Sequence, residues 1–521
     1  MAHVLPSILF VLAVIAAVAW AGRRLEFPVP VLLAVAGFAW SLFPGLAAPE
    51  IEPGIVLAVF LPPLLYADAW NASWIDFRRW LRPILQLAIG LVAFTIVTVG
   101  VVAKMLMPEL PWAACFLLGA IVSPTDTVAV HAVLERLRIT RRATAILGGE
   151  SLVNDATGLL GVSLATVVVA SGMFEAGEIG IRFASIAGLG VAVGVAVGLG
   201  AAWLNCRARG TEILVTLSLL APYVAYFVAE TVGASGVLAV VIAGFVASWR
   251  EHVIAPESRV ELYAVWGQLV FLLNALMFLF VGLETPHRLS DALTTMPGLI
   301  GSALIVALVV IASRFAWVFP GAYVPLILSE RLRRLEQGYP PPRYVLIAAW
   351  CGVRGAVSLA AALSIPPLLA DGTPFPGREQ IVACTLVVIL VTLVGQGLTL
   401  GPLVRALGVS AEDPSDAEVR AAREAMLAAG IARLDAYCTE ESCPIAVYRL
   451  RDAMSDELAT LKDTDATERT RAERRLAVAA DVRREVYRAQ AAELLRLRDG
   501  GALNDRAHQQ LQMELDRANH G

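Results

Sequence analysis

Two acidic residues and an amide lie in the middle of a long apolar stretch, residues 142–170. They are Glu150, Asn154 and Asp155, with Ser151 between them. A charge held at the centre of a bilayer costs about 2.5–3.5 kcal/mol on insertion scales, so such residues usually handle ions or protons. Ser151 and Asp155 share one helical face, and their oxygens suit hard cations such as Na⁺ or Li⁺. For Glu150 the structural alternative is a buried ion pair that only packs helices.

A second polar interruption lies in the apolar segment 112–134, where Ser123, Pro124, Thr125 and Asp126 follow one another. Proline has no backbone N–H and interferes with the helix before it, which frees carbonyl groups. A helix broken at mid-membrane depth exposes backbone oxygens that suit a desolvated cation. A simple proline kink is the alternative, although a kink alone does not require an acid.

A third interruption is Arg354, which has glycine on both sides in another apolar segment. The glycines permit an unwound backbone or a close helix approach. Arg354 requires an acidic partner, which Glu150 or Asp126 could supply, and Arg314 is a second candidate. If two acids and two arginines neutralise each other, Asp155 is the acid without a countercharge. We therefore assign Asp155 as the titrating carrier, while the sequence leaves open which arginine meets which acid.

Asp68 is the fourth polar group, at the end of the apolar segment 53–70. It lies near the predicted cytoplasmic end of that segment. A functional role and a simple helix-end position near water are equally compatible with the sequence.

The composition predicts a polytopic membrane protein. Of 521 residues, 58% are hydrophobic and only 17% are charged, whereas soluble domains are about a quarter charged. The apolar residues form blocks of about 20, the length that crosses a bilayer. The six cysteines show no metal-ligand spacing and no disulfide framework, and we expect no cofactor. Thirteen spans are predicted, at 4–21, 28–47, 53–70, 83–106, 112–134, 142–170, 182–206, 212–231, 235–249, 262–283, 297–328, 343–369 and 380–403.

The charges between the spans predict the orientation, because cytoplasmic loops carry an excess of arginine and lysine. The loops after even-numbered spans carry mainly acids, whereas the loops after odd-numbered spans carry arginines. An N-terminus outside and a C-terminus in the cytoplasm follow from this alternation. The arginines after odd-numbered spans are Arg23, Arg24, Arg78, Arg79, Arg82, Arg136, Arg138, Arg141, Arg142, Arg207, Arg209, Arg250, Arg259, Arg331, Arg333, Arg334 and Arg343.

The chain divides into a transmembrane domain, residues 1–404, and a cytoplasmic tail, residues 405–521. The tail is rich in charged residues, alanine and leucine with helical spacing, notably over Arg471–Arg498. It contains no glycine-rich nucleotide-binding loop, so an ATP-driven pump is not expected. A solvated helical appendage and a regulatory or dimer-supporting domain are both compatible with this pattern.

Four motifs in the first 405 residues resemble the cation:proton antiporter-1 family of sodium/proton exchangers. They are FLPPLLYADAW, SPTDTVAV, GESLVNDATG and GVRGAVSLAAALSIP, which occur in the family's order and spacing. The resemblance implies an all-α fold of about thirteen transmembrane helices with inverted repeats. It also implies interleaved core and dimerisation subdomains, a homodimer, and two broken helices that cross, here the fifth and twelfth spans.

The resemblance also implies roles for individual residues. The ion-binding acid maps onto Asp155, with Ser151 and the backbone oxygen of Thr125 as further ligands of the transported Na⁺. Asn154 precedes Asp155 as in electroneutral exchangers, where it holds helices together and does not titrate. The structural acid–arginine pair maps onto Glu150 with either Arg354 or Arg314.

Two positions depart from the family pattern. The family often has a glutamate where Ala67 stands here, followed by Asp68, and one residue along a helix is about 100° of rotation. Thr127 stands where the family usually has a proline, which bears on the shape of the first helix break.

The function expected from the residues and the resemblance is secondary active transport. Na⁺, or Li⁺ or K⁺, is exchanged for H⁺ across the inner membrane of a bacterium, one for one, by competition at Asp155, with a role in pH regulation. The expected partners are monovalent cations, protons, the lipid bilayer and a second copy of the chain, and not nucleic acid. The alternatives are a cation channel or a membrane sensor with the tail as its output. An intramembrane aspartyl protease using Asp126 and Asp155 lacks the expected Gly-x-Gly-Asp signature, and we expect no enzyme.

Overall fold

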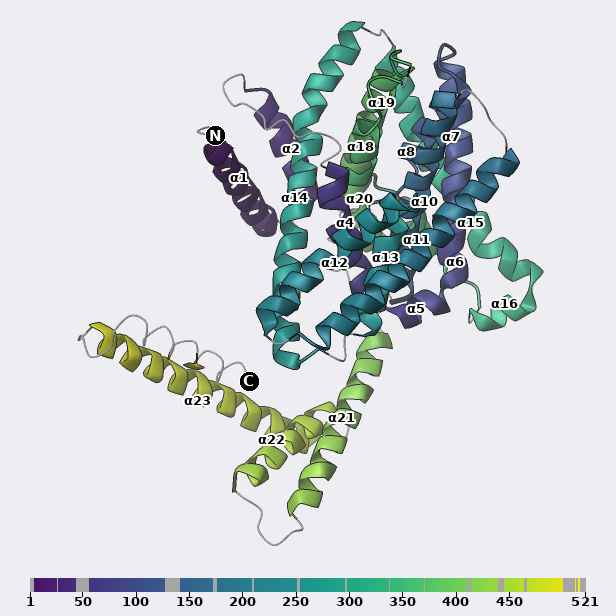
Figure 1. The fold of residues 1–521 in the computed structure, drawn as a ribbon. Helices are drawn as coiled ribbons and strands as arrows, with labels where there is room; N and C mark the ends of the chain where they lie inside the picture. Colours follow the sequence, from purple (N-terminus) through teal and green to yellow (C-terminus); the bar gives the residue numbers. More distant parts are fainter. Residues whose placement is uncertain are drawn as a thin grey trace. The chain divides into compact units, whose positions relative to one another are not determined.

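The chain forms two compact units, residues 1–411 and 412–521. The computed structural model describes residues 4–25, 27–43, 56–126, 141–171, 176–208, 210–250, 254–295, 298–336, 338–369, 371–409, 414–438, 445–462, 466–499, 511 and 514–515. The regular elements of these residues are helices, apart from one isolated β-bridge between Leu368 and Pro374 (Figure 1). This agrees with the predicted all-α fold.

The first unit contains helices that overlap every predicted span. Eight helices in the described part of the chain are long and apolar enough to cross a membrane, and three apolar helices are shorter. The exact number of crossings stays a prediction. The elements are α1 (Val4–Leu25), α2 (Val29–Ser41), η1 (Val56–Phe60), α4 (Leu61–Asn71), α5 (Trp74–Arg79), α6 (Leu81–Leu85), η2 (Gln86–Leu91), α7 (Val92–Leu106), α8 (Trp112–Ile121), α10 (Arg141–Ser171), α11 (Ala176–Asn205), α12 (Thr211–Thr231), α13 (Gly236–Trp249), α14 (Pro256–Thr295), α15 (Leu299–Leu328), α16 (Glu330–Leu335), α17 (Pro342–Trp350), α18 (Ala356–Leu363), α19 (Arg378–Leu390), η5 (Val391–Gln396) and α20 (Gly397–Ala406).

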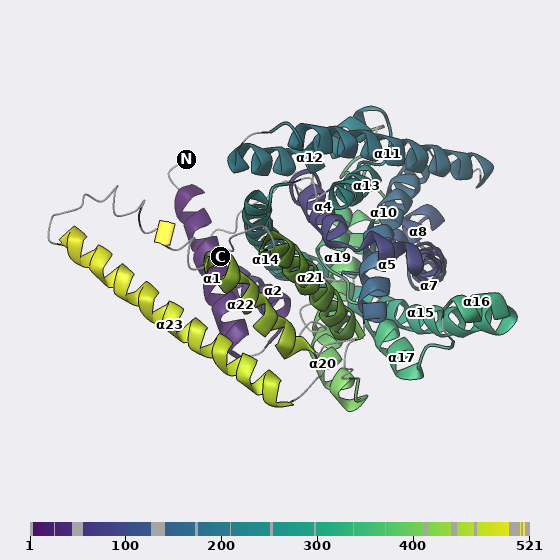
Figure 2. The ribbon, with the colours of Figure 1, turned by 90° about the horizontal axis from the view of Figure 1, so that it is seen from below.

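The helices of this unit pack around three large apolar clusters, one of which joins α1, α2, α14, α17 and the last span. The other two join further helices. One cluster joins α7, α8, α15, α18 and α19, and we call these helices with α10 the core group. The other cluster joins α4, α12, α13 and the start of α14, and α11 packs on α12 and α13. Figure 2 shows α11 and α12 along one side of the unit and α15 and α17 along the opposite side. Asp126 follows α8, Asp155 lies in α10 and Arg354 precedes α18, so all three lie in or beside helices of the core group.

Helices α2 and α14 pack closely because each carries a glycine at their crossing. A Cβ on Gly282 would lie 2.7 Å from the backbone nitrogen of Phe38 and 2.9 Å from the carbonyl carbon of Ala34. A Cβ on Gly37 would lie 3.0 Å from the backbone nitrogen of Leu283. Small residues at such crossings let two backbones approach, which is a main source of helix association in lipid.

The second unit contains three long helices, α21 (Pro414–Cys438), α22 (Ile445–Leu461) and α23 (Ala466–Asp499). Ion pairs of Arg451 with Asp435 and of Arg423 with Glu457 link α21 to α22. An ion pair of Arg475 with Asp456 links α23 to α22. The described part of the tail is therefore helical, as its composition predicts. Its location in the cytoplasm stays a prediction.

The α2–α14 crossing gives a first prediction, in which Gly282→Val is compared with Gly267→Val on the same helix. Valine at 282 would collide with the backbone of α2, and overpacking of this kind costs about 1–3 kcal/mol. A Cβ on Gly267 would meet no atom within 4 Å, so valine fits there. We expect Gly282→Val to lower the unfolding temperature in detergent and Gly267→Val to leave it near the parent value. Equal unfolding temperatures for the two variants would contradict this account of the crossing.

Candidate ion-binding site

The first break of the helical path follows α8. The helix ends at Ile121, and residues 122–126 are not helical, while the rest of the predicted span, including Thr127, lies outside the described residues. Ser123 donates a hydrogen bond from Oγ to the carbonyl of Ala120 at 2.9 Å, which closes the helix end. The break therefore begins at the Ser-Pro-Thr-Asp segment, as its proline predicts.

The second break separates α17 from α18, over residues 351–355. The backbone N–H of Asp126 donates to the carbonyl of Val353 at 2.8 Å, so the two unwound segments bond to each other directly. The Asp126 carboxylate lies against Gly355, where a Cβ would overlap it. An acid is favourable there because Gly355 lies at the N-terminus of α18, which is the positive end of the helix dipole.

Glu150 forms a buried ion pair with Arg314, and both residues are 1% exposed. Arg314 Nη2 donates to Glu150 Oε2 at 2.8 Å, and Nη1 bonds to the other carboxylate oxygen. Arg314 Nε donates to the carbonyl of Ala348 at 3.0 Å, and this bond fixes the guanidinium in its orientation towards Glu150. A two-pronged pair of this kind satisfies both charged groups at once.

Arg354 was the other candidate partner for Glu150 or Asp126, and for Glu150 the structure favours Arg314. Its three guanidinium nitrogens are buried and make no hydrogen bond to any described residue. The physical reason is that Arg314 already occupies both carboxylate oxygens of Glu150. The backbone N–H of Arg354 donates to Thr392 Oγ1 at 3.0 Å, which ties the second break to the last span.

The predicted cation ligands lie on α10 and the first break. Ser151 Oγ donates to the carbonyl oxygen of Thr125 at 3.2 Å, and Asn154 Nδ2 donates to Thr125 Oγ1 at 2.6 Å. Thr125 Oγ1 in turn donates to Glu150 Oε1 at 3.4 Å. The structure thus brings Thr125, Ser151 and Asn154 together at the edge of the break, with Glu150 behind them.

Asp155 lies one helical turn beyond Ser151 and is only 7% exposed. Its Oδ1 atom has no hydrogen-bond partner among the residues that the structure describes. Asp155 interacts electrostatically with Asp126, Asp68 and Arg354, so these charged groups surround one region. A buried carboxylate oxygen without a protein donor is costly unless a cation or a proton satisfies it.

Asp68 and its neighbour Ala67 lie on different faces of α4. Ala67 is 1% exposed and belongs to the apolar cluster around α13. Asp68 is exposed and interacts electrostatically with Asp126. Leu64, one turn earlier, packs against the small apolar cluster that contains Ala360 of α18. The acid displaced by one position therefore lies close enough to the candidate site to interact with Asp126.

Two buried polar residues of the last span were not identified from the sequence, Thr392 and Gln396. They are 0% and 2% exposed and lie four residues apart at the second break. Polar residues at this spacing in an otherwise apolar segment are a signal that could have identified them.

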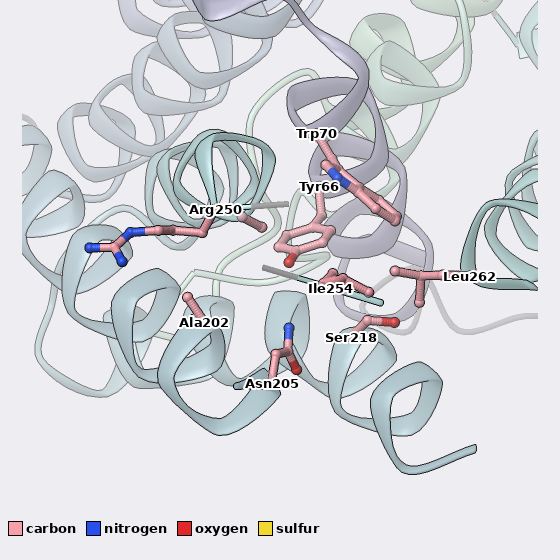
Figure 3. Close-up of a pocket in the computed structure, with 9 residues that line it drawn as sticks. Tyr66, Trp70, Ala202, Asn205, Ser218, Arg250, Ile254 and Leu262 are labelled. Atoms are coloured by element: carbon pink, nitrogen blue, oxygen red, sulfur yellow. The ribbon is translucent and has the colours of Figure 1, made fainter. Parts of the chain in front are cut away.

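A separate small cavity of about 20 Å³ lies between α4 and helices α11 to α14. Tyr66 and Asn205 reach into it, and Trp70 lies beside Tyr66 (Figure 3). None of the candidate cation ligands lines this cavity.

The fold and these residues define a membrane transporter of the cation/proton antiporter class. The chain belongs to the sodium/hydrogen exchanger family, whose model, described as "Sodium/hydrogen exchanger, transmembrane", matches residues 10–406. The residues that carried the resemblance all lie within this range.

Relatives and a solved structure support this assignment. The chain is 31% identical to an uncharacterized Na⁺/H⁺ exchanger, YjcE, of Escherichia coli, over 94% of this chain and 93% of that protein. It is 30% identical to a sodium, potassium, lithium and rubidium/H⁺ antiporter of Bacillus pumilus, over 86% of this chain and 68% of that protein. The sodium proton antiporter MjNhaP1 of Methanocaldococcus jannaschii has the same fold, with a TM-score of 0.62 and 21% identity over 78% of this chain and 99% of that one.

The buried ion pair gives a second prediction. Glu150→Gln leaves Arg314 as an uncompensated buried charge, which costs about 3–5 kcal/mol. We expect a lower unfolding temperature and a lower yield than in Glu150→Gln/Arg314→Met, where no charge is stranded. The control is Glu284→Gln, which breaks the partly exposed 3.1 Å pair with Arg288 and should cost at most about 1 kcal/mol. A double variant less stable than Glu150→Gln alone would contradict this role of the pair.

Proposed function

We propose that the protein exchanges Na⁺ for H⁺ by competition of the two ions for Asp155. The observation that carries this proposal is the contrast between two neighbouring acids on α10. Glu150 is neutralised by Arg314, whereas Asp155 keeps a buried oxygen without a hydrogen-bond partner in the described part of the chain. The paired acid is suited to hold helices together, and the other acid to bind a mobile cation.

In the proposed cycle, ionised Asp155 binds Na⁺ together with Ser151 Oγ and the backbone carbonyl of Thr125. Protonation makes Asp155 neutral and releases the cation. The site can turn from one membrane face to the other with either Na⁺ or H⁺ bound, because Asp155 then carries no unpaired negative charge. Ionised Asp155 without a bound cation does not make this movement, since burial of its bare charge is too costly. Exchange therefore follows without a leak of either ion.

The proposed stoichiometry is one proton for one Na⁺. The residue before Asp155 is Asn154, whose amide donates to Thr125 and does not titrate. Asp155 is then the one acid whose charge alternates, and the cycle moves no net charge. The role of Asn154 is to fix Thr125, whose carbonyl is a proposed ligand.

The proposed motion is a displacement of the core group against α4 and α14. Phe60, Leu64 and Met277 pack against Ala356 and Ala360 of α18, an apolar contact that excludes water on one side. Asp68, one turn beyond Leu64, is exposed. We propose that Asp68 lines the aqueous approach to Asp155 and attracts cations into it. Sliding at the apolar contact would open the opposite approach.

The cellular setting is proposed from the sequence and the relatives. We place the protein in the inner membrane of a bacterium as a homodimer, with the N-terminus outside and the C-terminus in the cytoplasm. The arginine-rich loops support the orientation. The Bacillus pumilus relative is named for sodium, potassium, lithium and rubidium, so we propose Na⁺ as the first substrate with Li⁺ and K⁺ as further candidates.

The carrier role of Asp155 gives a third prediction. Asp155→Asn keeps the size of the side chain but removes the charge, so Na⁺-dependent proton flux in proteoliposomes should fall to the level of protein-free liposomes. Asp371→Asn, which changes an exposed loop acid, should transport like the parent. Parent flux that is unchanged by valinomycin in K⁺ agrees with electroneutral exchange. Flux in Asp155→Asn equal to the parent would remove the proposal.

The approach role of Asp68 gives a fourth prediction. Asp68→Asn should raise the apparent KM for Na⁺ by about two- to tenfold while kcat changes little, because loss of one nearby charge weakens cation attraction. The effect should shrink as ionic strength rises with choline chloride, since salt screens exposed charges. An apparent KM equal to the parent at low salt would contradict this role.

A further inference from the structure

Two side chains at the second break carry polar atoms that no described residue satisfies. Arg354 is 0% exposed, and none of its guanidinium nitrogens has a hydrogen-bond partner there. Gln396 is 2% exposed, and neither its amide oxygen nor its amide nitrogen has a hydrogen-bond partner among the described residues. An unsatisfied buried polar group costs about 1–3 kcal/mol, and more when it is charged. A dry environment for both side chains is therefore unfavourable.

Gln396 lies directly beside the unwound segment. A Cβ on Gly352 would lie 3.6 Å from Gln396 Nε2 and 2.8 Å from Arg314 Cδ. One turn earlier, Thr392 accepts the backbone N–H of Arg354 at 3.0 Å. The last span thus presents two polar side chains to residues 352 to 354. Thr392 bonds to the backbone there, whereas the amide oxygen and nitrogen of Gln396 have no hydrogen-bond partner among the described residues.

The unwound segment is linked in turn to the proposed cation ligands. The carbonyl of Val353 accepts the N–H of Asp126 at 2.8 Å. The residue before Asp126 is Thr125, whose carbonyl accepts Ser151 Oγ at 3.2 Å. A shift of residues 352 to 354 would therefore move the Thr125 carbonyl. Discrimination among Na⁺, Li⁺ and K⁺ depends on the placement of such carbonyl oxygens.

We propose that the amide of Gln396 and the guanidinium of Arg354 bind ordered water that fixes the unwound segment 351–355. Gln396 is then a positioning residue that sets the Thr125 carbonyl and hence the choice among monovalent cations. Water has the required chemistry, because it accepts from the guanidinium and the amide nitrogen and donates to the amide oxygen. A cation is disfavoured there by the charge of Arg354. The inference rests on the proposed function of Thr125 as a ligand.

The test compares Gln396→Met, Gln396→Glu and the parent in proteoliposomes with Na⁺ and Li⁺ in turn. Methionine keeps the length of the side chain but cannot hold water, so the ratio of the apparent KM values for Li⁺ and Na⁺ should change by about fivefold, the effect of roughly 1 kcal/mol. Glutamate has the length of glutamine and can accept from the same ordered water, so its ratio should stay within about twofold of the parent.

The matched control is Thr385→Val on the same span. Thr385 is 0% exposed, and its hydroxyl donates to Ile381 within its own helix at 2.8 Å, so it holds nothing at the break. This variant should keep the parent ratio. A parent ratio in Gln396→Met, with or without lower yield, would overturn the positioning role. Should Asp155→Asn be inactive at the same time, the proposed function would stand and only this inference would fail.

A density map of the parent protein at a resolution that shows waters gives an independent measurement, which does not depend on how the variants fold. We expect a density peak within hydrogen-bond distance of both the Gln396 amide and the Arg354 guanidinium. Direct bonding between the two side chains, or apolar packing around the amide with no peak, would overturn the inference.

Discussion

The free energy of placing a charge away from water is the constraint on which this structure depends. Within the core group, Glu150 and Arg314 meet it by pairing, with both residues 1% exposed. Asp155, on the same helix, has no such partner for Oδ1 among the described residues. A carboxylate in that position is stable when a cation or a proton accompanies it. The same constraint that makes Asp155 costly therefore makes it suitable for the proposed exchange.

The two helix breaks supply backbone carbonyl oxygens, which an unbroken helix would use in its own hydrogen bonds. Each break frees backbone groups, and the bond from Asp126 N–H to the carbonyl of Val353 joins the two segments into one unit. Gly355 leaves room for the Asp126 carboxylate at the start of α18. The backbone beside Thr125 is thereby held in place, which suits its carbonyl for the proposed role as a ligand. Proline and glycine in these apolar segments thus serve the site.

The sequence predicted the helical segments well, because apolar blocks of bilayer length have few alternatives in lipid. It also named Glu150, Ser151 and Asn154, which the structure brings together at Thr125. Their roles in ion binding stay predictions. It could not select Arg314 over Arg354 as the partner of Glu150, since that depends on how α15 presents its guanidinium across the core group. The direction of Asp68 likewise depends on which face of α4 packs on α13. Gln396 was not identified, although its spacing of four residues from Thr392 in an apolar span was a signal for it.

The central claim is that Na⁺ and H⁺ exclude each other at one carboxylate, and proton release on cation binding tests it most directly. Purified protein would be titrated with NaCl by calorimetry in two buffers with different ionisation enthalpies. The account predicts that the measured heats differ between the buffers, in proportion to one proton released for each Na⁺ bound when Asp155 starts protonated, and that Asp155→Asn shows no such difference. Na⁺ binding to the parent protein with the same heat in both buffers across the pH range would contradict it.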